Sequence, residues 1–183
     1  SELDELRKMV KEVLDRVRDL LKKLEDEARK VAEDNKRLLE RNKREIEAAL
    51  RRVEEIIRRR RTEDVRREVE KILEELIRES ERSVRESKKH LDDVKRRVEE
   101  IVRRIKKELD DLLREAKRIV DEKEDKRVRE VLREVEKRIK ELEDLVRKVL
   151  DKIRELIERL KRETDKVLEE SKKLIKELSE RLE

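Results

Sequence analysis

The apolar residues of this chain repeat every 18 residues, and this period constrains the fold more than any other feature. In the first third of the sequence they are Leu3, Leu6, Val10, Val13, Leu14, Val17 and Leu20. The same positions 18 and 36 residues later are apolar again, except that Asn35 and Asn42 replace two of them. Eighteen residues make about five helical turns, so such a stripe runs along an α-helix without drifting. The period therefore predicts long, nearly untwisted helices, whereas a strict seven-residue repeat would impose a left-handed supercoil.

The stripe changes direction twice along the chain. If each residue is projected at about 100°, the centre of the stripe jumps by roughly 160° after Ile57 and by roughly 110° after Val120. One amphipathic helix cannot contain such jumps. They predict connections near residues 60–63 and 122–126. The three predicted helices are 2–60, 63–122 and 126–182.

Residues near the predicted connections agree with these boundaries. Thr62 and Asp125 are candidate N-caps, and Ser1 with Asp4 has the spacing of a capping box. The basic residues 58–61 suit a helix C-terminus. Neither connection contains a Gly, which is the usual residue of a left-handed C-cap.

The lengths and stripes of the three helices predict how they pack. Short connections make neighbouring helices antiparallel. Each stripe spans about 120–140°, which suits a helix that contacts two partners. We therefore expect an all-α, antiparallel up-down-up three-helix bundle, with 1–183 as one elongated domain. The pattern leaves the winding direction of the bundle open.

Composition supports a chain that is almost entirely helical. The sequence contains no Gly, Pro, Cys, Phe, Tyr, Trp or Gln. Gly and Pro build most turns, so a chain without them has little irregular backbone. Charged residues make up 61% of the chain. Such a charge content is common in disordered proteins, but the ordered apolar stripe favours a folded chain.

Charge and hydropathy argue against several classes of function. The net charge of +5 comes from 58 basic and 53 acidic residues, which predicts a mixed surface rather than a basic nucleic-acid-binding face. No apolar run approaches the roughly 20 residues of a membrane span. The acidic start of the sequence leads us to expect no signal peptide. Without Cys, the sequence offers no thiol chemistry.

The only site that we predict is a cluster of eight uncharged polar residues, which the alignment of the three helices brings together. The eight residues on the apolar stripes are Asn35, Asn42, Ser80, Ser83, Ser87, His90, Thr164 and Ser171. Folding the chain back at its connections brings Asn42 level with about residues 81 and 168, and Asn35 level with about residues 88 and 161. The eight residues should therefore meet in one segment of the bundle.

A buried hydrogen-bond network is the favoured interpretation of this cluster. A buried polar group costs about 1–3 kcal/mol if it is unpaired, so such groups are tolerated only when they satisfy one another. A network of this kind fixes which helices pair and in which register. That addresses a real problem, because a uniform core with an 18-residue repeat could slip by one repeat.

Three other interpretations are weaker. Ser87 and His90 lie three residues apart, like a nucleophile and its base, but nothing resembles an oxyanion hole or a substrate pocket. One His and no Cys cannot form a transition-metal site. The basic run 58–61 has no aromatic residues beside it for base stacking and is followed at once by Glu63 and Asp64.

With these features in view, the sequence resembles the parametrically designed helical bundles. It is similar in particular to untwisted antiparallel three-helix designs with 18-residue repeats, and to designs with modular hydrogen-bond networks in such cores. The resemblance covers the whole chain and rests on the repeat, the restricted alphabet and the Asn/Ser/Thr/His cluster. It implies a hyperstable scaffold without a natural biochemical function. The absence of Gly from the connections departs from many such designs.

We therefore expect a structural protein and not an enzyme, with no cofactor, no metal, no nucleic acid and no membrane among its partners. We expect a monomer, and a soluble cytoplasmic one if the chain is made in a bacterial host. The alternative is a helical interaction module or a self-assembling building block, spectrin-like or designed. A second apolar stripe on one helix would indicate that alternative, and the sequence contains none.

Overall fold

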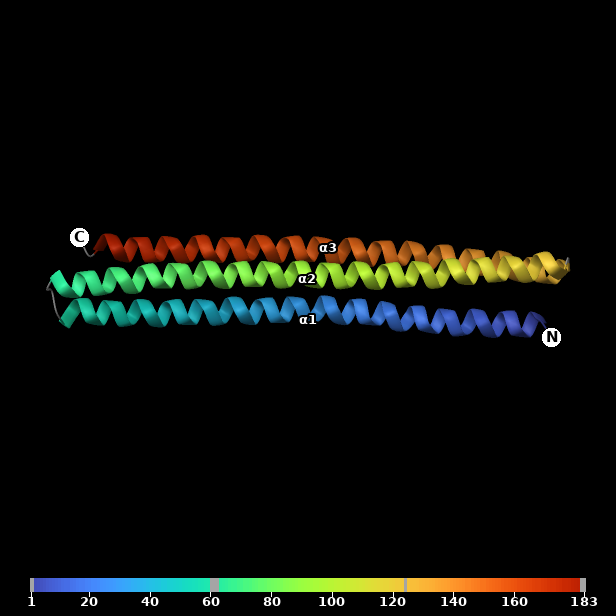
Figure 1. Ribbon diagram of the computed structural model, residues 1–183, viewed down its shortest axis with the longest axis horizontal. Coiled ribbons are helices and arrows are strands. Elements are labelled where there is room, and N and C mark those ends of the chain that lie inside the picture. The colour runs from blue at the N-terminus through green and yellow to red at the C-terminus, as the bar shows by residue number, and fades with distance from the viewer. Residues whose placement is uncertain (1, 60–62, 124, 182–183) are drawn as a thin grey trace. The chain divides into compact units, whose positions relative to one another are not determined.

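The protein is an all-α three-helix bundle, as the sequence predicts. The computed structural model describes residues 2–59, 63–123 and 125–181, without the side chains of Glu2 and Lys123. Its helices are α1 (Glu2–Arg59), α2 (Glu63–Lys123) and α3 (Lys126–Arg181), and no strand occurs among the described residues (Figure 1). The predicted helices agree with these bounds to within one residue wherever the chain is described. Predicted helix ends at residues 60 and 182, and the candidate caps Ser1 and Thr62, lie outside the described residues.

Asp125 caps α3 at its N-terminus. Its carboxylate Oδ1 accepts a hydrogen bond from the backbone N–H of Arg127 at 3.2 Å. Its backbone carbonyl accepts the N–H of Arg129 at 3.1 Å, which begins the helical pattern of bonds. A side-chain acceptor in this position satisfies an N–H group that has no partner within the helix. The prediction of Asp125 as an N-cap is confirmed.

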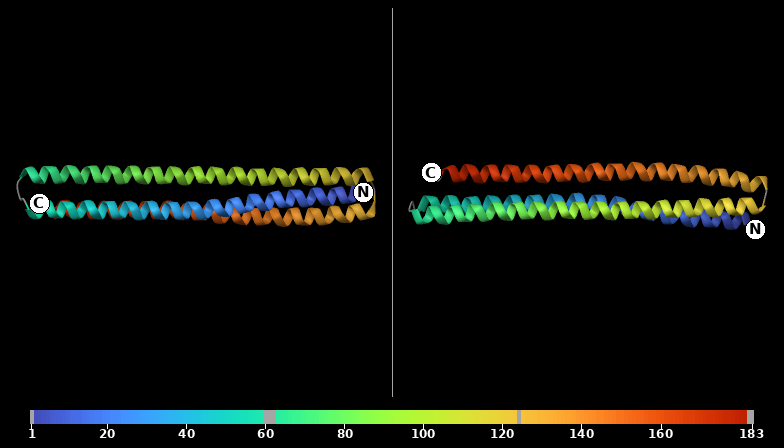
Figure 2. Two further views of the ribbon diagram at one scale, coloured as in Figure 1. Left: turned by 90° about the horizontal axis from the view of Figure 1, so that it is seen from below. Right: turned by 45° about the horizontal axis from the view of Figure 1, so that its top comes forward.

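Contacts along the backbone divide the chain into two compact units. Unit 1 comprises Ser1–Arg29 and Val94–Glu155, and unit 2 comprises Lys30–Asp93 and Leu156–Glu183. Each unit contains a segment of all three helices, and Figure 2 shows from two further sides that α2 runs beside α1 and α3 in each unit. The expectation that 1–183 forms one domain stays a prediction.

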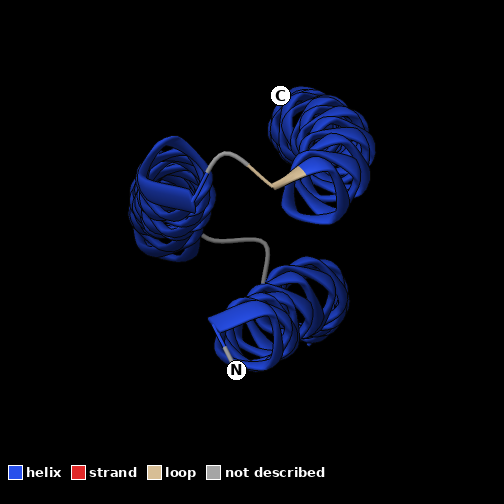
Figure 3. Ribbon diagram, turned by 90° about the vertical axis from the view of Figure 1, so that its right-hand side faces the viewer, coloured by secondary structure: helices blue, strands red, loops and turns tan. Residues whose placement is uncertain are grey.

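Ion pairs give the helix directions within unit 1. Arg16 Nη2 lies 3.3 Å from Glu108 Oε2, and Glu27 Oε2 lies 3.8 Å from Arg97 Nη2. From the first pair to the second, the residue number rises by 11 in α1 and falls by 11 in α2. The two segments are therefore antiparallel. Seen from the end at which α1 begins, the segments of α1, α2 and α3 in unit 1 lie at the corners of a triangle and follow one another clockwise (Figure 3).

Unit 2 has the same arrangement of directions. Lys172 Nζ lies 3.0 Å from Glu81 Oε1, and Lys161 Nζ lies 2.5 Å from Asp92 Oδ1, so α2 and α3 are antiparallel. Arg181 of α3 pairs with Glu54 of α1 at 3.7 Å. Eighteen or so residues earlier on both helices, Thr164 meets Asn35, so α1 and α3 are parallel. The up-down-up order of the three helices is thus present in each unit.

The apolar stripes form the core of both units. In unit 1, the side chains of Leu6, Ile105 and Leu109 are fully buried. The buried cluster nearest the α1–α2 connection in unit 2 comprises Val53, Val69, Leu73, Ile175 and Leu178. The 18-residue repeat predicts burial well, because every member of one such column is inside. Val17, Asn35 and Val53 have exposed fractions of 0%, 4% and 0%.

Truncating a core leucine should destabilise the protein far more than truncating a surface leucine. Leu91 is fully buried, whereas Leu145 is 47% exposed. We expect Leu91→Ala to lower the free energy of unfolding by about 2–5 kcal/mol, because it removes buried apolar surface and leaves a cavity. Leu145→Ala should change it by less than about 0.5 kcal/mol. Guanidinium unfolding followed by circular dichroism measures both, and equal losses would contradict the burial described above.

Candidate functional site

Three of the eight predicted polar residues form a hydrogen-bonded chain that joins the three helices of unit 2. Ser87 Oγ of α2 donates to Asn35 Oδ1 of α1 at 2.8 Å. Asn35 Nδ2 donates to Thr164 Oγ1 of α3 at 3.4 Å. Thr164 Oγ1 in turn donates to the backbone carbonyl of Leu160 at 2.7 Å. We call Asn35, Ser87 and Thr164 the first layer.

The first layer is buried inside an apolar stripe. Asn35, Ser87 and Thr164 have exposed fractions of 4%, 3% and 0%. A polar group in such a place loses its hydrogen bonds to water, so it must find partners in the protein. The chain supplies them, because each side-chain oxygen of the layer takes part in at least one bond. The layer therefore adds polar contacts to the core without a large desolvation penalty.

A second set of polar residues repeats the first, seven residues along each helix. Asn42 follows Asn35 on α1, Ser80 precedes Ser87 on α2, and Ser171 follows Thr164 on α3. All three are buried, with exposed fractions of 8%, 2% and 6%. We call these three residues the second layer. Because α2 is antiparallel to the other helices, a shift of seven residues takes all three positions to one new level.

The second layer is bonded differently from the first. Ser171 Oγ donates to the backbone carbonyl of Val167 at 2.8 Å, just as Thr164 bonds Leu160. Ser80 Oγ is buried and has no hydrogen-bond partner among the described residues. The structure shows no hydrogen bond from Asn42 to any described residue. The second layer therefore has the polar groups of the first without its connection between helices.

The prediction that His90 belongs to a buried network is wrong, and Ser83 lies only at its margin. His90 is exposed and Ser83 is half-buried. On α2, His90 projects roughly 80° from the centre of the buried face, and Ser83 roughly 60°. Ile72 and Glu108 stand 18 residues before and after His90. Ile72 is itself only half-buried, so that column runs along the edge of the stripe.

The structure also excludes Ser87 and His90 as a catalytic nucleophile and its general base. Ser87 is buried and its hydroxyl is bonded to Asn35, while His90 faces the solvent. A general base must lie within hydrogen-bond reach of the group that it activates. No group of three or more His, Cys, Asp or Glu residues in the described ranges is arranged to hold a metal ion. None of the described helices has a stretch apolar and long enough to cross a membrane.

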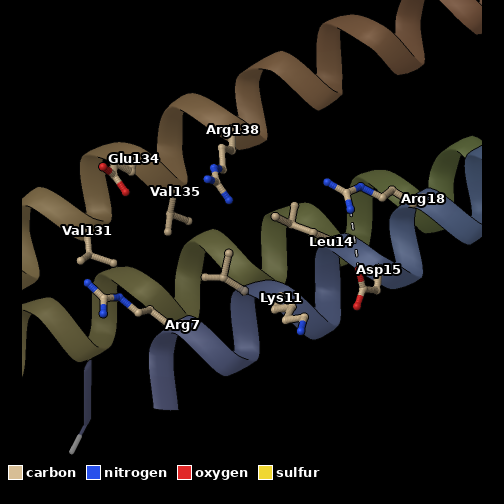
Figure 4. A pocket seen from close by; sticks show the side chains of 10 residues that line it. Arg7, Lys11, Leu14, Asp15, Arg18, Val131, Glu134, Val135 and Arg138 are labelled. Atoms are coloured by element: carbon tan, nitrogen blue, oxygen red, sulfur yellow. Dashed lines mark ion pairs between the residues drawn. The ribbon is translucent and has the colours of Figure 1, made fainter. Parts of the chain in front are cut away.

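Unit 1 contains a groove whose lining has none of the uncharged polar residues found in the two layers. It lies between α1 and α3, has a volume of about 370 Å³, and is drawn in Figure 4. Its walls carry Val131, Val135 and Leu14 beneath charged side chains, and Asp15 Oδ1 lies 3.9 Å from Arg18 Nη1. No hydroxyl, thiol or imidazole is among the residues that line it. The groove therefore offers no hydroxyl, thiol or imidazole for nucleophilic or general-base catalysis.

Two ion pairs between α2 and α3 flank the first layer, and the sequence analysis did not identify them. Lys88 pairs with Asp165, directly after Ser87 and Thr164 in the sequence. Lys161 pairs with Asp92, three residues from Thr164 on α3 and five residues from Ser87 on α2, and only 23% of the Lys161 side chain is exposed. The predicted register sets Lys88 level with about residue 161, so it places the two members of each pair about four residues apart and does not single them out. Both carboxylates remain about half exposed, so these pairs are surface contacts between α2 and α3.

The ion pair with Asp92 changes the titration of Lys161. The hydrogen bond from the Lys161 ammonium to Asp92 raises the pKa of Lys161 above its ordinary value, and partial desolvation opposes the change. The attraction of Asp92 and Glu158 for the charged ammonium adds to the increase. Opposite charges at this distance favour the charged form of both groups.

Comparisons with known proteins do not place the chain in a family. No protein-family model matches it. No curated protein sequence matches it either. A solved structure described as a computationally designed three helix bundle is similar to 98% of this chain and 82% of its own, at 18% identity and a TM-score of 0.32. A superposition that weak does not identify a relative.

Removing the central residue of the first layer should cost more than removing the whole layer. Asn35→Leu leaves the hydroxyl of Ser87 buried without its acceptor, so we expect a loss of about 1–3 kcal/mol in unfolding free energy. The triple change Asn35→Leu, Ser87→Ala, Thr164→Val removes all three polar groups together. It should be neutral or stabilising. Guanidinium unfolding measures both, and a triple variant less stable than the single one would refute this account.

The Lys161–Asp92 pair should add stability that disappears at high pH. The folded chain holds the Lys161 proton more tightly than the unfolded chain, because its pKa is raised above 10.5. The contribution is therefore complete below that value and is lost as pH rises through the folded pKa. We expect wild type to exceed Lys161→Gln by about 0.5 kcal/mol near pH 8, and the difference to shrink as pH rises through the raised pKa of Lys161. Urea unfolding at several pH values tests this, and a difference that grows with pH would contradict it.

Proposed function

We propose that this protein is a designed structural scaffold without enzymatic activity, in which the first layer specifies helix pairing and register. The observation that carries the proposal is the chain from Ser87 through Asn35 to Thr164, which links all three helices inside the core. The layer catalyses nothing in this view. It selects one alignment of three helices whose apolar stripes would otherwise accept several.

The composition of the stripes explains why such selection is needed. Apolar burial is non-directional and is proportional to area, so it does not distinguish Leu from Val or Ile at a given level. The connecting sequences contain no Gly or Pro, and thus no residue that would fix the position of the turn. An alignment shifted along the helices would bury almost the same apolar surface. Directional bonds are required to make one register better than the others.

The polar layers make shifted registers costly. A slip of 18 residues would bring Asn35 level with Val69, and a slip of seven would bring Asn42 level with Leu73. Val69 and Leu73 are both buried and have no polar side-chain atom. A buried amide facing such a residue loses its partners, at about 1–3 kcal/mol for each unsatisfied group. Only the native register brings Asn35 to Ser87.

The restricted alphabet, the 18-residue repeat and the mixed surface support the designed origin in this proposal.

The scarcity of exposed apolar side chains supports a monomer. In the described parts of the chain, the large apolar side chains that are exposed are Leu145 in unit 1 and Leu174 in unit 2. One leucine per unit is not a stripe, and single exposed leucines are common on monomeric proteins.

Register can be measured directly with two spin labels in unit 2. The chain has no native Cys, so nitroxides can be attached at Glu33→Cys on α1 and Arg67→Cys on α2, both exposed positions. A slip of seven residues would change their separation by about 10 Å. With the first layer intact we expect one narrow distance distribution by double electron–electron resonance. In the triple apolar variant we expect a broader distribution or a second one.

The same samples separate a scaffold from an assembling module. Light scattering should give a mass of 22.6 kDa that does not change with concentration. A dimer or trimer would favour the interaction module. A triple variant with the same narrow distance distribution as wild type would remove the layer's role in register, whatever the mass.

A further inference from the structure

Ion pairs between α2 and α3 follow one constant register, and we call them the ladder. They are, in order along α2, Glu81–Lys172, Lys88–Asp165 and Asp92–Lys161 in unit 2, and Glu99–Arg154 in unit 1. From each pair to the next, the residue number rises on α2 by seven, four and seven, and it falls on α3 by the same amounts. Together the three steps make one 18-residue period of the apolar stripes. The ladder therefore keeps a fixed position beside the stripes.

One pair of the ladder has the opposite polarity to the others. In the pairs of Glu81, Asp92 and Glu99, the acid belongs to α2 and the base to α3. Lys88 and Asp165 reverse this order, and we call them the reversed pair. Opposite charges beside a helix–helix seam set which alignment is preferred. A row of uniform polarity would attract again after a shift along the helices, whereas the reversed pair marks one position in the row.

Shifts of seven or eleven residues are alternatives that the apolar stripes allow. Such a shift turns the buried face of a helix by only about 20°. A shift of seven residues would set Lys88 against Lys172 in one direction, and Asp165 against Glu81 in the other. A shift of eleven residues would set Lys88 against Lys176. In each of these alignments, one member of the reversed pair faces a like charge.

The reversed pair acts on the choice of register more than on stability. The side chains of Lys88 and Asp165 are 38% and 51% exposed, and an exposed ion pair adds little to the free energy of unfolding. The preference for a register depends on a different comparison, between attraction in one alignment and repulsion in another. The pair can therefore discriminate between alignments although it stabilises the fold only slightly.

We propose that the reversed pair Lys88–Asp165 sets the register of α3 on α2. The proposal rests on the function proposed above, in which one register is selected, and it assigns part of that selection to charge. The first layer joins α1 to both neighbours through Asn35, whereas the ladder joins α2 to α3. Loss of the first layer should therefore release α1 while α2 and α3 stay aligned.

The test measures the α2–α3 distance in the full chain, with the triple apolar variant as background because it lacks the first layer. Nitroxides at Arg67→Cys and Arg162→Cys, both exposed positions, report the alignment of α2 and α3 in unit 2. With the native ladder we expect one narrow distance by double electron–electron resonance. The exchange Lys88→Asp with Asp165→Lys keeps an ion pair in the native register but gives the ladder one polarity. After a shift of eleven residues it also sets an acid against Lys176, so we expect a second distance about 16 Å longer.

The matched control exchanges a ladder pair of the ordinary polarity. Asp92→Lys with Lys161→Asp also preserves the composition of the chain and an ion pair in the native register. A shift of eleven residues would then set a base against Lys172. The control should therefore keep one narrow distance, and circular dichroism should show the same helix content in both exchange variants.

Three results would overturn the proposal. They are a second α2–α3 distance in the background with native charges, a single narrow distance after the exchange at Lys88 and Asp165, and the same second distance in the control. Failure of the first layer's role is a separate outcome. It would appear between the labels at Glu33→Cys and Arg67→Cys, as a distance distribution that the triple apolar changes leave unaltered.

Discussion

Removal of one apolar stripe per helix from water is the interaction on which this fold depends. Complete burial of a Leu, Ile or Val side chain contributes about 1.5–3 kcal/mol, whereas a typical internal hydrogen bond contributes about 0.5–1.5 kcal/mol net. The core contains many such apolar side chains in both units, among them Leu24, Leu91 and Ile157. The hydrogen bonds of the first layer are few. Most of the stability therefore comes from the apolar stripes. In the function proposed above, the polar layers favour one register of the three helices over the others.

The two polar layers differ in a way that separates these roles. In the first layer, Asn35 connects α1 to both neighbours, and two ion pairs between α2 and α3 lie near it in the sequence of both helices. In the second layer, Asn42 and Ser80 are equally buried and lie beside a groove instead. Thr164 of the first layer corresponds to Ser171 of the second, and both hydroxyls donate to the carbonyl four residues earlier. Similar residues thus form a hydrogen-bonded contact between helices in the first layer and lie beside a groove in the second.

Most of the fold could be predicted from the sequence, because a helix stripe is a local and repetitive signal. The jumps in the stripe located the ends of α1, α2 and α3, and helical rise then placed Asn35 level with the region of Ser87 and Thr164. His90 was misplaced because periodicity gives the direction of a side chain only to within the width of the stripe. At the edge of that stripe, exposure depends on how closely the neighbouring helix approaches, which no local pattern contains.

The bonding within each layer could not be predicted for a related reason. Levels along the helices follow from 1.5 Å per residue, but a hydrogen bond forms or fails over a few tenths of an ångström. Ser80 and Ser87 lie seven residues apart on the same buried face of α2 and differ in what surrounds them. The two grooves and the orphaned hydroxyl of Ser80 arise at this scale, and so they appear only in the three-dimensional structure.

The first layer also has a direction. The hydrogens point from Ser87 of α2 to Asn35 of α1 and from Asn35 to Thr164 of α3, and the last bond, from Thr164 to the Leu160 carbonyl, lies within α3. Exchanging the oxygen and nitrogen of the Asn35 amide would require both hydroxyls to reverse their roles, and Thr164 would then give up its bond to the Leu160 carbonyl. The bond from Thr164 to Leu160 therefore favours one of the two orientations of the Asn35 amide over the other.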